Sequence, residues 1–239
     1  MSTPEIFRRN ELLLGETECA ALAKKRVAVF GVGGVGSWCA EMLVRAGVGG
    51  VLLVDDDLVA ASNVNRQLPA TTRTIGQPKV EVMRERLLEI NPSADVVARR
   101  ERYTPETATA FHLADFDAVV DAIDSVACKA ALIRNALSAE GTRLVSSMGA
   151  AGRVDPSRIR ASLFSKVAGD GLARALRQRF KRDGAPPPRD FLCVWSDEQC
   201  VNHGERRPED GTANGSFAPV TASFGIQLAS LAITLFKTT

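Results

Sequence analysis

The sequence predicts an α/β fold, with a Rossmann-like, mostly parallel sheet covered by helices on both faces and a C-terminal extension of strands and a basic helix. Short apolar runs typical of buried parallel strands recur at residues 26–30, 51–54, 118–121 and 143–146. Segments of helical composition separate these runs, and a glycine-rich turn, GVGGVG, follows the first run directly. There is neither an internal repeat nor a long linker, so residues 1–239 are expected to form a single domain with parts at about 1–150 and 151–239.

The composition is that of an ordinary globular protein. The 239 residues are 45% hydrophobic and 24% charged, with a net charge of +2, so a nucleic-acid partner has to be held by a local basic patch. The five cysteines include no C-x-x-C pair, which excludes a zinc knuckle and a disulfide framework. The first residues are polar and charged, unlike a signal peptide, and a reducing cytoplasm is the expected location.

The first elements form a βαβ unit. A helix at 16–25 precedes the strand at 26–30, and beyond the glycine-rich turn a helix at 37–46 leads to the strand at 51–54. Such a crossover is expected to be right-handed. Next come a helix at 77–90, with Pro78 in its first turn, and a strand at 95–99.

The pattern continues with a helix opening at Thr104, then strands at 118–121 and 143–146 around a helix at 128–139. After Gly152 we expect a strand at 159–163 and an arginine-rich helix at 170–181.

The last part of the chain is expected to be a polar, mobile loop at 198–216 and an apolar segment at 217–236. The apolar segment is close to the length of a membrane span, but it contains Pro219, Gln227 and several hydroxyl side chains. We therefore predict a buried helix at a core or subunit interface, with peripheral membrane contact left open.

The glycine-rich turn predicts a nucleotide site. One glycine permits the tight turn, one lets the backbone approach a phosphate, and one allows close packing of helix on strand. The N-terminus of the following helix offers unpaired N–H groups to an anion. Asp55 ends the second strand, where a carboxylate can accept hydrogen bonds from ribose hydroxyls. These features fit an NAD-dependent dehydrogenase equally well.

Charged residues further along favour ATP over a dinucleotide. Arg66 follows the second strand, and Lys79 opens the next helix, which places two cations near the phosphates. A triphosphate undergoing substitution needs them because charge builds on the leaving pyrophosphate. Asp124, at the end of a later strand, can hold Mg²⁺ against those phosphates.

With these motifs in order, the sequence resembles the adenylating superfamily of the ubiquitin-activating enzymes and the bacterial ThiF, MoeB and HesA proteins. The matching pieces are GVGGVGS, LLVDDDLVAASNVNRQ, IGQPKVEVM, INP and DAIDS. The resemblance implies that Asp55 binds the ribose and that Asn63, Arg66 and Lys79 bind the triphosphate. The full ATP-binding set it implies is Gly31, Gly33, Gly34, Gly36, Asp55, Asp57, Asn63, Arg66, Gln67, Lys79 and Asp124.

The resemblance also implies a homodimer in which an N-terminal arginine reaches the ATP of the partner. Arg9 matches that arginine best, and Arg8 is the alternative. The family usually has another arginine near the position of Ile6, where this chain departs from the pattern. The implied catalytic residues are Arg9, Arg66, Lys79 and Asp124, with Asp124 as the metal ligand.

Within the superfamily, the chain resembles the branch of tRNA threonylcarbamoyladenosine dehydratases more closely than the sulfur-carrier activators, which carry two C-x-x-C pairs. The similarity runs through VGSW, DAIDSV, KAALI and GAAG to VTASFG near the C-terminus. It implies ATP and Mg²⁺ as cofactors, tRNA and not DNA as partner, and an adenylated carboxylate that cyclises with loss of AMP. A sulfur-relay protein partner stays open. The alternatives are adenylation of a small sulfur-carrier or ubiquitin-like protein, an NAD-binding oxidoreductase and a nucleotide sensor without catalysis.

Two groups of residues in the second part need separate interpretation. Cys193 and Cys200 invite a nucleophile hypothesis, but nothing near them in sequence lowers a thiol pKa, so we expect structural thiols. The arginine-rich helix is expected to contact tRNA phosphates. Its basic residues are Arg174, Arg177, Arg179, Lys181 and Arg182.

Overall fold

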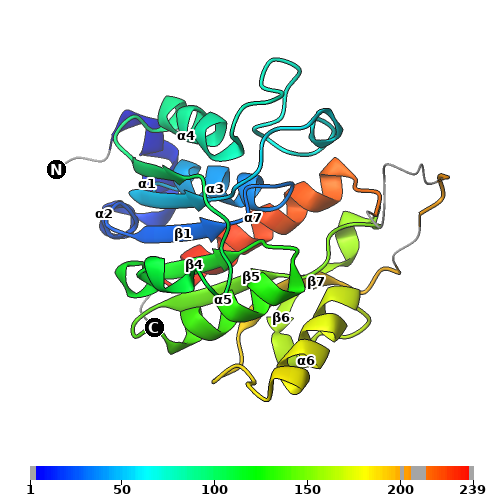
Figure 1. The fold of residues 1–239 in the computed structure, drawn as a ribbon. Helices are drawn as coiled ribbons and strands as arrows, with labels where there is room; N and C mark the ends of the chain where they lie inside the picture. Colours follow the sequence, from blue (N-terminus) through cyan, green and yellow to red (C-terminus); the bar gives the residue numbers. More distant parts are fainter. Residues whose placement is uncertain (1–3, 200–201, 206–213, 237–239) are drawn as a thin grey trace.

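A computed structural model of the chain describes residues 4–199, 202–205 and 214–236. Seven strands form one sheet in the order β3-β2-β1-β4-β5-β7-β6 (Figure 1). The strands are β1 Arg26–Phe30, β2 Gly50–Val54, β3 Asp95–Arg99, β4 Ala118–Asp121, β5 Arg143–Ser147, β6 Ile159–Leu163 and β7 Leu192–Ser196. All neighbouring strands are parallel except β6 and β7. The expected Rossmann-like, mostly parallel sheet is confirmed.

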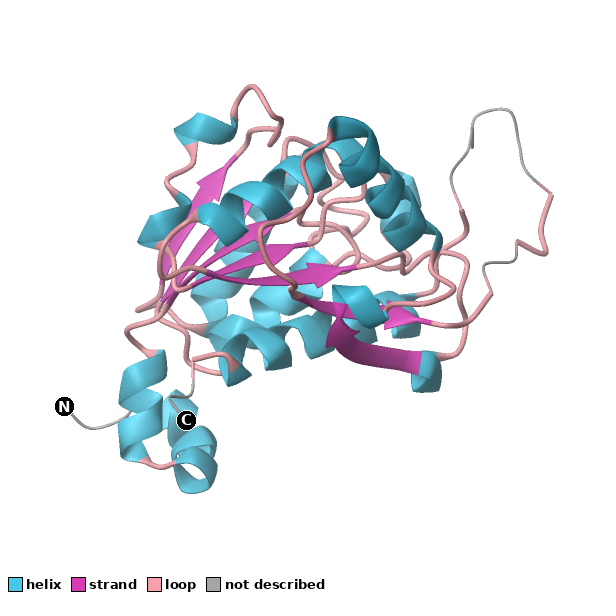
Figure 2. Cartoon of the chain, turned by 90° about the horizontal axis from the view of Figure 1, so that it is seen from below, coloured by secondary structure: helices cyan, strands magenta, loops and turns pink. Residues whose placement is uncertain are grey.

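Helices cover both faces of this sheet, as the edge-on view in Figure 2 shows. The helices are α1 Arg8–Leu14, α2 Glu16–Leu22, α3 Gly36–Arg45, α4 Lys79–Ile90, α5 Val126–Ser138, α6 Gly171–Asp183 and α7 Ala218–Thr234. Side chains alternate along each strand, so Val27 and Val29 pack with α3, α4 and α7, whereas Ala28 and Phe30 pack with α5. The two apolar layers fix the positions of the helices whose ends surround the site.

The prediction of a helix that begins at Thr104 is wrong. Residues 104–107 form a turn in which the side-chain oxygens of Thr104 and Thr107 accept each other's backbone N–H, at 3.3 and 2.9 Å. Threonine hydroxyls that bond to nearby backbone compete with helix formation. Only a short 3₁₀ turn, Ala108–Ala110, follows.

The C-terminal apolar segment is a buried helix, as predicted. α7 packs against α3, and a Cβ added at Gly225 would lie 2.4 Å from the carbonyl oxygen of Val35. Among the described residues, no helix has both the length and the apolar character needed to traverse a bilayer.

Candidate active site

A cavity of about 570 Å³ opens at the carboxyl ends of the central strands. It lies where β1 and β4 are neighbours and the chain order reverses, the place where open α/β sheets bind ligands. The sequence-predicted residues that line it are Gly31, Gly33, Gly34, Asp55, Asp57, Asn63, Arg66, Gln67, Lys79 and Asp124. The fold therefore brings together nearly all of the predicted ATP-binding set from five separate segments of the chain.

The glycines of the turn between β1 and α3 have distinct surroundings. Gly31 has a φ of 87°, and a Cβ there would lie 2.7 Å from the carbonyl oxygen of Ala122. A Cβ at Gly36 would lie 1.8 Å from the carbonyl oxygen of Gly31, so Gly36 packs the helix onto the turn and does not line the cavity. Gly33 is open, with its nearest neighbour, Nε2 of Gln67, at 3.8 Å. Among the glycines of this turn, Gly33 thus leaves the most free space at the backbone for a phosphate.

Asp55 is held in place by the turn. Its carboxylate accepts the N–H of Val32 at 2.7 Å and the N–H of Asp57 at 2.9 Å. Burial raises the pKa of Asp55, while Lys79 and the two N–H groups oppose that rise. The oriented carboxylate lines the cavity at the end of β2 and can accept hydrogen bonds from ribose hydroxyls.

The two predicted cations, Lys79 and Arg66, both line the cavity, and each already makes hydrogen bonds within the chain. The Lys79 ammonium is 2.6 Å from the Asp57 carboxylate, and the lysine side chain is only 5% exposed. Arg66 donates to the carbonyl of Ser62 and to the side chain of Asn65 at 2.9 and 2.8 Å. Both bonds come from one guanidinium nitrogen, which leaves other N–H groups for an anion.

Gln67 and Asn63 offer neutral polar groups to the same space. The amide oxygen of Gln67 is buried and finds no hydrogen-bond partner in the part of the chain that is described. Asn63 uses its amide oxygen to accept the N–H of Ala60 at 3.1 Å. A buried acceptor without a partner is costly, so a ligand hydroxyl or water at Gln67 is expected.

Asp124 is exposed at the cavity, in the turn between β4 and α5. It makes no hydrogen bond or ion pair with residues 4–199, 202–205 or 214–236. A free carboxylate beside the phosphate-binding turn is the kind of ligand that Mg²⁺ takes together with nucleotide phosphates, so these residues fit a metal–ATP complex.

Two buried ion pairs near the cavity were not predicted from the sequence. Asp121 and Lys129 are both fully buried and 2.8 Å apart. Arg153 and Asp170 are almost as buried and 2.7 Å apart. The sequence signal for the first pair is a single lysine in the apolar run CKAALI.

The Arg153–Asp170 pair supports the part of the cavity wall that is formed by the segment after β5 and the start of α6. Arg153 donates to the carbonyl of Gly149, and Asp170 accepts the N–H of Gly149 at 3.2 Å and the N–H of Ala173 at 2.8 Å. The same aspartate thus caps α6 and fixes the segment after β5. Both Gly149 and Leu172, at the start of α6, line the cavity.

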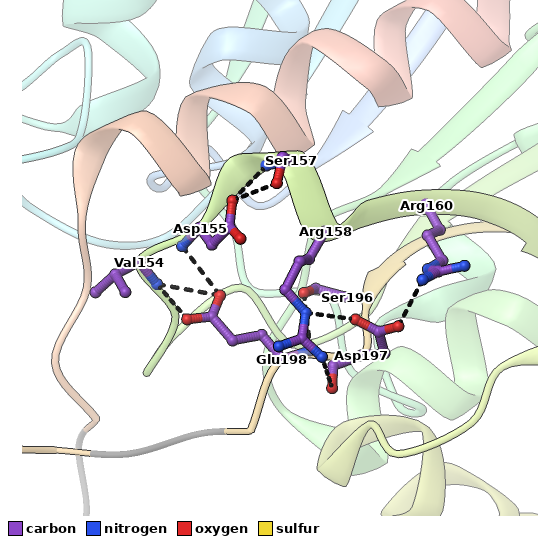
Figure 3. A network of polar contacts seen from close by, with 8 residues as sticks. All are labelled: Val154, Asp155, Ser157, Arg158, Arg160, Ser196, Asp197 and Glu198. Atoms are coloured by element: carbon purple, nitrogen blue, oxygen red, sulfur yellow. Dashed lines mark hydrogen bonds and ion pairs between the residues drawn. The ribbon is translucent and has the colours of Figure 1, made fainter.

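A network of polar contacts ties the segment after β7 to the segment after β5 (Figure 3). Glu198 accepts the N–H groups of Val154 and Asp155 at 3.0 and 3.1 Å. Asp197 pairs with Arg158 and Arg160 at 2.8 and 2.7 Å. Because both arginines already pair with Asp197, they are weaker candidates for RNA contact than basic residues without an ionic partner.

The basic residues of α6 fall into two groups. Arg177 donates to the carbonyls of Phe164 and Val167 at 2.8 and 2.7 Å. Arg179 pairs with Asp183 at 2.7 Å, and Arg182 lies 4.0 Å from the same carboxylate. Arg174 and Lys181 are exposed and have no hydrogen-bonding or ionic partner among the described side chains. They are seven residues apart in the sequence and therefore lie on one face of the helix.

Arg9 does not reach the cavity of its own chain. Asn10, next to it on α1, donates to the carbonyl of Arg45 at 3.0 Å, at the end of α3 remote from the glycine-rich turn. A helix of that length is about 15 Å long. Arg9 and Arg8 are both exposed there.

The expectation that Cys193 is a structural thiol and not a nucleophile is supported. Cys193 is completely buried in β7, and burial raises the pKa of its thiol. A buried thiol of this kind is unreactive. Cys200 lies outside the described residues.

The model of the ThiF family matches residues 7–239, and the chain belongs to this family. The chain is similar to the tRNA threonylcarbamoyladenosine dehydratase of Bacillus subtilis (strain 168), at 43% identity over 195 residues that cover 82% of this chain and 76% of the relative. It is 35% identical to the protein of that name from Escherichia coli (strain K12), over 92% of this chain and 89% of the relative. The crystal structure of E. coli TcdA, tRNA N6-threonylcarbamoyladenosine dehydratase, in complex with ATP has a TM-score of 0.87 and covers 97% of this chain and 93% of that one.

Proposed function

We propose that the protein is an ATP-dependent dehydratase that cyclises N6-threonylcarbamoyladenosine at position 37 of tRNA. The observation that carries the proposal is the cavity at the switch point, where an open glycine backbone, two cations and a free carboxylate face one another. The likeness to tRNA threonylcarbamoyladenosine dehydratases over most of the chain supports the substrate.

In the proposed reaction, the carboxylate of the threonylcarbamoyl group attacks the α-phosphate of ATP and pyrophosphate leaves. An atom of the ureido group then attacks the activated carbonyl, closes a ring and expels AMP, so that one water is lost overall. Asp55 orients the ribose, and the backbone at Gly33, together with Arg66 and Lys79, binds the phosphates and neutralises the leaving pyrophosphate. Asp124 holds Mg²⁺, which supplies further charge neutralisation at the phosphates.

The chain divides the two substrates between its parts in this proposal. The nucleotide is bound by residues up to about 150. The RNA is bound by residues from about 151, with Arg174 and Lys181 of α6 on its phosphates. In this proposal Arg9 acts on the ATP of the partner in a homodimer. Within its own chain, α1 contacts the C-terminal end of α3, whereas the glycine-rich turn lies at the N-terminal end of that helix.

The experiment measures pyrophosphate release from ATP with purified protein and three acceptors: tRNA that carries threonylcarbamoyladenosine, the same tRNA without the modification, and a small sulfur-carrier protein. Release only with the modified tRNA, and a tRNA product lighter by one water, are expected. Asp124→Asn should abolish both signals. Release with the carrier protein instead would favour the alternative within the superfamily, against which the lack of C-x-x-C pairs already argues.

A further inference from the structure

Asp121 and Lys129 form an ion pair inside the apolar layer between the sheet and α5. Both side chains are 0% exposed, and the neighbours of Lys129 on α5, Ala130, Ala131 and Leu132, belong to that layer. A pair of this kind gains little stability, because removing two charges from water costs as much as their attraction returns, and apolar replacements are often neutral. Its presence below the cavity therefore needs an explanation other than fold stability.

The pair engages both backbone polar groups of one residue, Ile123. The N–H of Ile123 donates to the Asp121 carboxylate at 3.2 Å, and the carbonyl of Ile123 accepts from the Lys129 ammonium at 3.0 Å. Ser146 of β5 donates to the same carboxylate at 2.7 Å, which anchors the pair to the sheet. The carbonyl of Ile123 belongs to the peptide bond that leads into Asp124, so the buried pair fixes the plane from which the Asp124 side chain departs.

We propose that Lys129 and Asp121 are positioning residues that set the orientation of Asp124 toward the metal bound with ATP. This inference rests on the proposed role of Asp124 as the Mg²⁺ ligand. Neither residue touches the cavity with its charged group in this arrangement; each acts through the backbone of Ile123. The expected consequence is a loss of metal affinity with the nucleotide site otherwise preserved, as is typical when groups that orient a metal ligand are removed.

The test uses the double variant Asp121→Asn with Lys129→Met, in which no unpaired charge is left in the core. ATP binding is measured by calorimetry without RNA, once with Mg²⁺ and once with EDTA, and the ratio of the two affinities reports the metal alone. The ratio of the ATP affinity with Mg²⁺ to that with EDTA should be about 10–100-fold smaller for the double variant than for the unsubstituted protein. Its affinity for ATP in EDTA should remain near that of the unsubstituted protein.

A matched control is available at the other end of β4. Lys25 and Asp117 are 2.7 Å apart and partly exposed, just before the strand begins. Lys25→Met with Asp117→Asn should leave the tightening by Mg²⁺ unchanged. Ser146→Ala, which removes one bond to Asp121 and no charge, should shift the tightening in the same direction as the double variant but less; it keeps the test informative if the double variant fails to fold.

The outcomes separate the inference from the function on which it rests. A folded double variant, or Ser146→Ala, with full tightening by Mg²⁺ overturns the positioning role. If Asp124→Asn also retains full tightening, the assignment of the metal to Asp124 fails with it. If the tightening is lost as expected but modified tRNA is not cyclised, the positioning role stands and the proposed substrate fails.

Discussion

At the scale of single residues, Gly33 and Gly36 are only three positions apart but are constrained in different ways. Alanine at Gly36 would place its Cβ 1.8 Å from a backbone oxygen that cannot move without displacing the turn. Alanine at Gly33 meets nothing closer than a side-chain nitrogen at 3.8 Å, but it fills the space where a phosphate would approach. Gly36→Ala should destabilise the fold by about 3 kcal/mol or more, whereas Gly33→Ala should keep the melting temperature and lose ATP binding.

Thermal unfolding and ATP calorimetry on both variants check this prediction. Gly171→Ala serves as the control, because a Cβ there has no neighbour within 4 Å. Tight ATP binding by Gly33→Ala would show that the phosphates lie elsewhere.

Asp55 predicts a pH dependence of nucleotide binding. Burial raises the pKa of this carboxyl group, so it takes up a proton at a higher pH than an ordinary aspartate. Only the ionised form accepts two ribose hydroxyls, so ATP affinity should fall as the pH is lowered through the raised pKa. Asp55→Asn should bind ATP roughly ten- to a hundredfold more weakly at neutral pH. This fold-change corresponds to the free energy of about 1.5–3 kcal/mol that a hydrogen bond to a charged group contributes.

The control is the ratio of the ATP affinities of the unsubstituted protein and Asp55→Asn at each pH. Titration of the ATP phosphates affects both affinities equally and therefore cancels in this ratio. The advantage over Asp55→Asn should therefore shrink on acidification. A constant advantage down to the acid limit of folding would contradict the assignment of the ribose to Asp55.

At the scale of elements, α6 is the part most directly open to test as an RNA-binding surface. Charge reversal at Arg174 and Lys181 should weaken tRNA binding and lower the slope of log affinity against log salt by about 2, one for each phosphate contact. Arg177→Glu is a poorer test, since it also breaks two bonds to backbone carbonyls and would loosen the helix. Binding is measured by filter retention over a range of salt concentrations.

The matched control is reversal of Lys24 and Arg143, which are exposed at the amino ends of β1 and β5, away from the cavity. This pair changes the net charge equally and should leave the salt slope unchanged. Equal effects of the two double variants would mean that α6 contributes bulk charge and not specific contacts.

The elements differ in how far local sequence determines them. The strands β1, β2 and β4 and the helices between them could be predicted because apolar runs and glycine breaks are local signals. β7 could not, because the place of Leu192–Ser196 between β5 and β6 depends on contacts between residues that are distant in sequence. The turn at Thr104 failed because hydroxyl–backbone bonds displaced a helix that Pro105 and Glu106 favoured.

The same distinction applies to the site. Gly31, Asp55 and Lys79 belong to contiguous motifs, and the sequence placed them at one cavity. The unpaired oxygen of Gln67 and the two buried ion pairs depend on which side chains the fold excludes from water. Charged residues are usually solvated, so residue type alone does not identify Lys129 of α5 or Arg153 of the segment after β5 as buried.

At the scale of the whole molecule, Ile6 and α1 present exposed apolar side chains. Ile6, Leu12 and Leu13 are 59%, 61% and 84% exposed, although they are large apolar side chains. Arg9 lies between them in the sequence and is separated from the nucleotide turn of its own chain by the length of α3. In the homodimer proposed above, Arg9 acts on the ATP of the partner, and complementation between protomers tests that proposal.

Two purified heterodimers, each assembled by coexpression of differently tagged chains, give opposite expectations for action in trans and in cis. In the first, an Arg9→Ala chain is paired with a Lys79→Ala chain. If Arg9 acts in trans, the Arg9→Ala chain keeps its own Lys79 and receives Arg9 from its partner, so one of two sites is complete and roughly half of the wild-type activity is expected. In the second, an unsubstituted chain is paired with a chain that carries both substitutions. There the unsubstituted site receives no Arg9 and the other lacks Lys79, so cyclisation should be nearly abolished. If Arg9 acted within its own chain, the activities of the two heterodimers would be reversed, because only the second would then contain a complete site.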